Sequence, residues 1–163
     1  MGGIAKGLLV APSGETIVAR WRRLFGQVGL PVVLVGARPE YADLGLPLID
    51  DDPPGVGPVG GLVALLREGP AVVVACDMPF VTDALLRRLV AAPVQAPIVA
   101  PRRDGRWEPL FARYDVSVLP FARSRIAHGQ LGLQGLLDEG GAAELPMEAN
   151  EWAELADWDT LPP

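Results

Sequence analysis

The sequence predicts an α/β fold, a three-layer α/β/α sandwich around a Rossmann-like, mostly parallel sheet. Apolar runs rich in β-branched residues, at 31–36, 71–75 and 97–100, alternate with segments of helical apolar spacing. Runs without polar alternation are typical of strands that are buried on both faces. Because alternating strands and helices form βαβ units, we expect helices on both faces of the sheet.

Helices are predicted from apolar spacing and capping residues. Ile17, Trp21 and Leu24 follow Ser13 or Thr16, either of which could be the N-cap. Further helices are expected at 59–67, 83–91, 116–128 and 133–139. Between them we expect a short helix or turn at 38–43, an extended segment at 46–50, and a turn at 102–105 that leads into 107–114.

Composition limits the classes of function. The 163 residues suit one domain, 1–163, with one core. A net charge of −6 without a basic stripe argues against nucleic-acid partners. The single cysteine, Cys76, excludes an internal disulfide framework, and we expect it to pack as a small hydrophobe. No apolar run reaches the length of a membrane span, and the first residues lack a secretion-signal layout, so we expect a cytoplasmic protein without a membrane partner.

The most informative motif is Cys76-Asp77-Met78-Pro79-Phe80, directly after the apolar run 71–75. Asp77 therefore lies where a strand leaves the sheet, and open α/β sheets bind ligands outside these carboxyl ends. Pro79 ends the strand because it has no N–H for the ladder. A carboxylate here suits Mg²⁺, which prefers oxygen ligands and substrate phosphates. The alternative is that Asp77 caps the following helix.

A second motif places acidic residues before a glycine-rich turn. Asp50 and Asp51 precede Gly57, Gly60 and Gly61, and the turn runs into a helix. Glycines let backbone N–H groups approach a ligand, and a helix N-terminus favours anions. Alternatively, these glycines only mark a turn.

Charged residues near the two ends complete the set of candidates. Lys6 has few cationic neighbours, although a lone lysine of this kind is usually solvent-exposed. Asp157 and Asp159 alternate, so on an extended segment both carboxylates share one face. The alternative is an acidic surface tail.

In this order, the motifs resemble those of the molybdenum cofactor guanylyltransferases, which are Rossmann-like nucleotidyltransferases with a fold like that of the nucleotide-diphospho-sugar transferases. The resemblance covers nearly the whole chain, and 76–80 is its most specific part. The matching segments are 1–3, 6–9, 15–18, 50–53, 57–61, 76–80 and 108–111.

The resemblance implies Mg²⁺-dependent transfer of a guanylyl group from GTP to molybdopterin, with release of pyrophosphate. It implies that Lys6 and Asp77 are catalytic, that Asp77 holds Mg²⁺, and that Asp159 or Asp157 adds a second metal ligand. It also implies molybdoenzymes or cofactor-delivery proteins as possible partners. The implied nucleotide-binding residues are Lys6, Asp50 or Asp51, Gly57, Gly60, Gly61 and Asp77.

The family signature begins with a buried strand that runs into Leu-Ala-Gly-Gly, and this sequence starts after that point. Such a strand is central, so we expect an exposed apolar sheet edge. One interpretation is that the true start lies upstream. Another is a catalytically impaired relative that acts as a binding or regulatory partner. A separate alternative for the activity is a relative that uses CTP.

Overall fold

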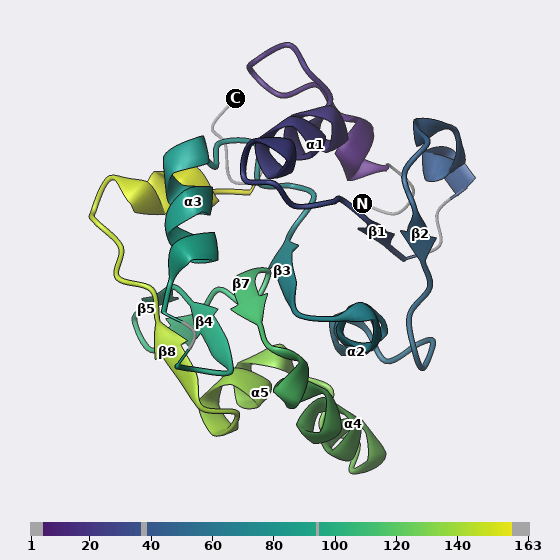
Figure 1. Ribbon diagram of the computed structural model, residues 1–163, viewed down its shortest axis with the longest axis vertical. Helices are drawn as coiled ribbons and strands as arrows, with labels where there is room; N and C mark the ends of the chain where they lie inside the picture. The colour runs from purple at the N-terminus through teal and green to yellow at the C-terminus, as the bar shows by residue number, and fades with distance from the viewer. Residues whose placement is uncertain (1–4, 37–38, 94, 158–163) are drawn as a thin grey trace.

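The computed structural model describes residues 5–36, 39–93 and 95–157, and its strands and helices alternate as an α/β fold (Figure 1). The helices are α1 (Ile17–Gln27), α2 (Pro58–Glu68), α3 (Asp83–Ala91), α4 (Leu119–Ala127) and α5 (Leu133–Glu139), with short 3-10 helices η1 (Lys6–Leu8), η2 (Pro39–Leu44), η3 (Val116–Val118) and η4 (Glu151–Leu155). The strands are β1 (Leu34–Val35), β2 (Leu48–Ile49), β3 (Ala71–Val74), β4 (Ile98–Ala100), β5 (Arg102–Arg103), β6 (Arg106–Trp107), β7 (Phe111–Tyr114) and β8 (Ala142–Glu144).

The strands pair in a mixed pattern. The largest sheet has the order β3-β7-β4-β8, in which β7 runs antiparallel to both neighbours and β8 runs parallel to β4. β1 and β2 form a separate parallel pair. β5 and β6 form a hairpin around the turn that was predicted at 102–105, and Trp107 of β6 is buried.

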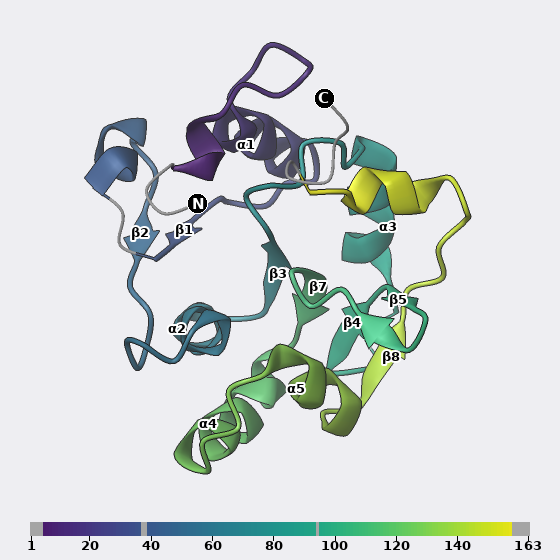
Figure 2. The ribbon, with the colours of Figure 1, turned by 180° about the vertical axis from the view of Figure 1, so that it is seen from behind.

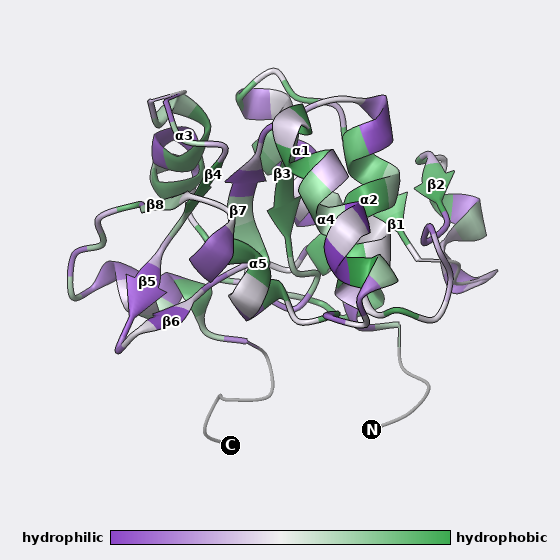
Figure 3. Cartoon of the chain, turned by 90° about the horizontal axis from the view of Figure 1, so that it is seen from below, coloured by the Kyte–Doolittle hydropathy of each residue, from purple (hydrophilic) through white to green (hydrophobic). Residues whose placement is uncertain are grey.

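Alternate side chains of β3 separate the core into two parts, which confirms the three layers. Val72 and Val74 pack with α1 and α3 on one face, whereas Ala71 and Val73 pack with α2, α4 and α5 on the other. Figures 1 and 2 show these two groups of helices on opposite sides of the strands. Figure 3 colours β3 as hydrophobic and the β5–β6 hairpin as hydrophilic, consistent with a strand that is covered on both faces and a hairpin that is largely exposed.

Local sequence signals explain the helices well. Thr16 is the N-cap of α1, and its hydroxyl accepts the N–H of Ala19 at 3.3 Å. α3 and α5 have the predicted bounds. His128 is the C-cap residue of α4, and its Nδ1 lies 2.7 Å from the carbonyl oxygen of Ser124.

The predicted strands 31–36 and 71–75 are less enclosed than expected. Among the described residues, the first pairs over Leu34–Val35 alone, with β2 as its neighbour. All four residues of β3 are half-buried, whereas those of β4 are fully buried. Helices cover both faces of 71–75, as expected, but its residues are only half-buried because β3 is at the edge of its sheet among the described strands.

A cleft of about 910 Å³ lies between these two strands, lined by residues of β1, β3, α1 and α2. The expected exposed apolar sheet edge is therefore present. The cleft is open along the strands, and its polar end carries the candidate site residues described next.

Candidate functional site

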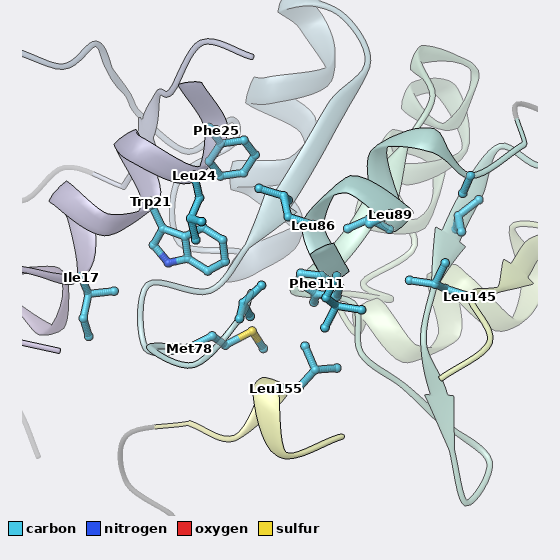
Figure 4. Close-up of a cluster of buried hydrophobic side chains, with 14 of the residues drawn as sticks. Ile17, Trp21, Leu24, Phe25, Met78, Leu86, Leu89, Phe111, Leu145 and Leu155 are labelled. Carbon is cyan, nitrogen blue, oxygen red and sulfur yellow. The ribbon is translucent and has the colours of Figure 1, made fainter. Parts of the chain in front are cut away.

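Asp77 is fixed at the edge of the cleft by the buried residues that follow it. Ala75 continues from β3 and donates its N–H to the carbonyl oxygen of Leu110 at 2.7 Å. Met78 is 6% exposed and packs in the core near Trp21 (Figure 4), while the Asp77 side chain remains 23% exposed. Because Met78, the next residue, is buried, the partly exposed carboxylate of Asp77 has little freedom to turn away from the cleft.

The alternative that Asp77 caps the next helix is wrong. Thr82 is the N-cap of α3, and its hydroxyl accepts the N–H of Leu85 at 3.2 Å. Asp77 is therefore not needed by the helix and remains available at the cleft.

Lys6 lies against Asp77, with its Nζ donating to Oδ2 at 3.0 Å. The Lys6 side chain is 34% exposed, so it is half-buried against Asp77 and does not point freely into solvent. Ala5 and Gly7 are buried on either side of it, and the N–H of Gly7 donates to the hydroxyl of Tyr41 at 3.1 Å. The short η1 segment thus positions a cation beside the carboxylate from a place 71 residues away in the chain.

The acidic turn contributes one carboxylate to the same cleft. Asp51 lines it together with Gly57, Gly61 and Asp77, whereas Asp50 is exposed and is not among the lining residues. Asp51 and Asp77 follow β2 and β3 respectively, so the structure brings together carboxylates from two strand ends.

The glycines of the turn allow α2 to approach the acidic turn closely. Gly57 is the N-cap of α2 with a φ of 73°, a conformation that favours glycine. A Cβ on Gly60 would lie 2.7 Å from the carbonyl oxygen of Pro53, and one on Gly61 would lie 2.6 Å from Cγ1 of Val35. Gly60 and Gly61 are buried, so their contribution to the site includes packing the first turn of α2 beside Asp51.

Cys76 corrects a further prediction. It lines the cleft and is exposed, so it does not pack as a core hydrophobe. Desolvation of the thiolate by surrounding atoms, followed by the charge of Asp77, raises the pKa of the Cys76 thiol. The thiol is therefore held neutral and is not an activated nucleophile.

The donor set decides what cation the site could hold. Within the described parts of the chain there is no group of three or more His, Cys, Asp or Glu residues placed to hold a metal. Asp157 is half-buried near Glu108, and Asp159 lies outside the described residues. Mg²⁺ is usually bound through one or two carboxylates together with substrate phosphates and waters, so Asp77 fits a cation that arrives with a phosphorylated substrate.

Some positioning residues could not be identified from the sequence. Tyr41 was part of an expected short helix, and nothing in the pattern indicated its hydrogen bond to Gly7. Glu154 accepts both the N–H and the hydroxyl of Thr82, at 2.9 Å and 2.8 Å, which ties the C-terminal segment to the start of α3. Both are contacts between distant segments, which periodicity does not reveal.

Comparison with known proteins identifies the family of the chain. The sequence profile of the MobA-like NTP transferase domain matches residues 1–143. The chain belongs to this family. It is 32% identical over 163 residues to a molybdenum cofactor guanylyltransferase of Pseudomonas entomophila, covering 94% of this chain and 82% of that protein. A Pseudomonas putida protein of the same name is 34% identical over 146 residues, covering 84% and 75%.

Solved structures agree with the fold. Molybdopterin-guanine dinucleotide biosynthesis protein A from Archaeoglobus fulgidus superposes with a TM-score of 0.77 at 24% identity, covering 97% of this chain and 86% of that one. The 2-C-methyl-D-erythritol 4-phosphate cytidylyltransferase from Thermus thermophilus has a TM-score of 0.66 at 17% identity, covering 93% and 86%. These likenesses place the chain in the Rossmann-like nucleotidyltransferase fold. Among residues 5–36, 39–93 and 95–157, every helix is too short or too polar to cross a bilayer.

Proposed function

We propose that this protein transfers a guanylyl group from GTP to molybdopterin, with release of pyrophosphate, at the polar end of the cleft. The observation that carries the proposal is the contact between Lys6 Nζ and Asp77 Oδ2 at the end of β3, in a chain of the MobA-like family. A cation beside a carboxylate at a strand end is suited to a triphosphate and its accompanying metal. The names of the Pseudomonas relatives support guanylyl transfer in particular.

In this reaction a phosphate oxygen of molybdopterin attacks the α-phosphorus of GTP, and the bond from that phosphorus to the pyrophosphate oxygen breaks. Catalysis depends mainly on positioning the two phosphates and offsetting their charge. Lys6 offsets the negative charge of the triphosphate while that charge shifts onto the leaving pyrophosphate. Asp51, Gly57 and the first turn of α2 hold the guanine and ribose side, where Asp51 lies closer to the cleft than Asp50.

Asp77 is the residue that would hold Mg²⁺. When bound, Mg²⁺ would supply charge neutralisation between phosphate oxygens. Asp77 contacts Lys6 through Oδ2, so one carboxylate can serve both the lysine and a cation. We propose Asp159, which follows the described residues, as a second ligand, with Asp157 as the alternative.

The proposal is tested by mass detection of the guanine dinucleotide product and of pyrophosphate, from GTP and molybdopterin with Mg²⁺. Asp77→Asn keeps the shape of the side chain and removes its charge. We expect product formation to fall about 100-fold, because one electrostatic group of a transfer site is lost.

Asp104→Asn is the matched control, because Asp104 lies in the exposed turn of the β5–β6 hairpin with a φ of 50°, which asparagine tolerates. It should leave the rate unchanged. Full Mg²⁺-dependent turnover by Asp77→Asn would show that the metal role assigned to Asp77 is wrong. Absence of product from the folded wild-type chain would instead favour a non-catalytic relative.

A further inference from the structure

We propose that Gln134 and Asp138 of α5 are positioning residues for the acceptor half of the reaction. They hold the β5–β6 hairpin, and through it the segment 108–110, against the strand end that carries Asp77. A role toward molybdopterin presupposes guanylyl transfer, so it rests on the function proposed above. The hairpin extends from the body of the molecule (Figure 3), and its contacts with α5 fix where it lies.

Gln134 completes the backbone pairing of β6. Glu108 donates its N–H to the carbonyl oxygen of Pro101 across the hairpin at 2.9 Å, so the backbone groups of Trp107 face away from β5. The side chain of Gln134 binds both groups. Its Oε1 accepts the N–H of Trp107 at 2.9 Å, and its Nε2 donates to the Trp107 carbonyl oxygen at 2.7 Å. A side-chain amide thus replaces the second neighbouring strand that β6 lacks among the described strands.

Asp138 fixes the side chain of the same tryptophan. It lies one turn after Gln134, so both residues share the face of α5 that meets β6. Oδ1 of Asp138 accepts the indole N–H of Trp107 at 2.9 Å. Arg102 covers the ring, with its Cζ 4.7 Å from the ring centroid and its Nη2 3.8 Å from Oδ1 of Asp138. The hairpin therefore cannot swing away from α5 without breaking three hydrogen bonds to Trp107.

α5 is itself held firmly against α4. Gly135 leaves no room for a Cβ beside the Arg125 guanidinium, so the two helices approach closely at this point. Arg125 is 7% exposed, and its Nη1 lies 2.6 Å from Oε2 of Glu139 at the end of α5. Leu136 and Leu137 of the same helix are buried in the core. α5 is thus a fixed support for the hairpin.

The segment 108–110 connects the hairpin to the strand end, and each of its three carbonyl oxygens accepts a hydrogen bond. The donors are, in chain order, the N–H of Phe111, the hydroxyl of Tyr114 and the N–H of Ala75, at 3.0, 2.8 and 2.7 Å. Ala75 lies two residues before Asp77. The position that α5 gives to the hairpin is therefore passed to the flank of the strand end that carries Asp77.

This flank is opposite to the one proposed for GTP. Asp51 and Gly57 line the cleft on one side of β3, whereas β7 and the segment 108–110 lie on the other. With GTP on the first side, molybdopterin is left the side of the hairpin. Side chains alternate along β6, so Arg106 points away from α5, and its exposed guanidinium suits the phosphate of an acceptor.

The experiment compares Gln134→Met with wild type in rate assays that vary molybdopterin at saturating GTP. Methionine keeps the length of the side chain and removes both hydrogen-bonding groups. We expect the KM for molybdopterin to rise at least about tenfold, because a small misplacement of binding groups is costly. The Kd for GTP, measured by calorimetry, should stay within about twofold of wild type, because the GTP side of β3 is untouched.

Gln27→Met is the matched control. Gln27 is also a helical glutamine, and its exposed side chain makes no hydrogen bond within the described chain. The control should change neither constant. A second pair of variants tests the indole contact: Asp138→Ala should raise the KM for molybdopterin, and Asp138→Asn, which keeps an oxygen for the indole N–H, should restore most of the loss.

Amide hydrogen exchange by NMR follows the same route without turnover. In Gln134→Met the N–H of Ala75 should exchange at least about tenfold faster, because Leu110 is held less firmly. Val73 pairs with Ala112, further from the hairpin, and its exchange should remain unchanged.

Unchanged exchange at Ala75 in Gln134→Met, or a KM for molybdopterin equal to that of Gln27→Met, would overturn the proposal. A matching loss of GTP affinity would also overturn it, since the hairpin would then support the whole site rather than its acceptor half. Absence of product from the folded wild-type chain would count against guanylyl transfer itself, and the exchange of Ala75 would still decide whether α5 holds the segment 108–110.

Discussion

The close approach of α2 to the acidic turn gives a quantitative prediction for Gly60→Ala. The added Cβ would lie 2.7 Å from the carbonyl oxygen of Pro53, 2.9 Å from Cγ2 of Val56 and 3.3 Å from Cβ of Asp51. Ordinary carbon–oxygen contacts are about 3.3–3.6 Å, so a backbone carbonyl must give way by roughly 0.6–0.9 Å. Overpacking of this kind costs about 1–3 kcal/mol.

Gly26→Ala is the matched control, because Gly26 is also helical and a Cβ there meets nothing within 4 Å. Both substitutions gain up to about 1 kcal/mol of helix propensity, so their difference isolates the overpacking. We expect Gly60→Ala to be less stable than Gly26→Ala by about 1–3 kcal/mol, or roughly 2–12 °C in Tm for a chain of this size.

Chemical denaturation followed by circular dichroism measures this difference. Because the displaced carbonyl belongs to the same turn as Asp51, Gly60→Ala should also weaken GTP binding, whereas Gly26→Ala should not. Equal stability of the two variants would refute the packing argument for Gly60.

Three other predictions concern the supports of the site. Thr82→Ala removes the hydroxyl that accepts the N–H of Leu85, so the free energy of unfolding measured in urea should fall by about 1 kcal/mol. Thr82→Ser should restore most of this loss. An unchanged urea midpoint in the alanine variant would contradict the capping role. Tyr41→Phe removes the acceptor for the buried N–H of Gly7, which should lower the free energy of unfolding by about 1–3 kcal/mol. A thermal midpoint equal to that of wild type would show that this hydrogen bond does not stabilise the fold. Burial, partly opposed by the charge of Arg106, raises the pKa of Glu108. The folded protein therefore holds the proton of this carboxyl more tightly than the unfolded chain does, and stability is lost as the pH rises through the folded-state pKa. Glu108→Gln should therefore gain stability over wild type as the pH rises above the ordinary range of a glutamate carboxyl, about pH 4, and a gap in Tm that does not widen with pH would argue against this shift.

The helices follow from the sequence because their signals are local. The bounds of α3 and α5 match the predicted 83–91 and 133–139, since apolar spacing and flanking residues set them. Strand pairing depends on neighbours that are distant in the chain. The run 71–75 has the composition of an interior strand but lies at the edge of its sheet among the described strands, and Cys76, which follows it, is exposed rather than packed.

In the candidate site, too, some features follow from local sequence and others depend on contacts between distant residues. That Asp77 lies at a strand end follows from the apolar run before it and the proline after it. Its contact with Lys6 joins residues 71 positions apart, and only the family resemblance suggested that both belong to one site. That Asp51 rather than Asp50 lines the cleft is seen only in the structure, because adjacent residues face different ways and a sequence pattern does not fix which one faces the cleft.

The most direct test of the central claim is a calorimetric titration of GTP into the folded chain with Mg²⁺ present, and of CTP under the same conditions. We expect GTP to bind at one site and CTP to bind at least about tenfold more weakly, with the GTP heat reduced in Asp77→Asn, since selective binding of one base requires specific polar contacts. Equal affinity for the two nucleotides, or no binding of either, would contradict the assignment of a guanylyl-transfer site to this cleft.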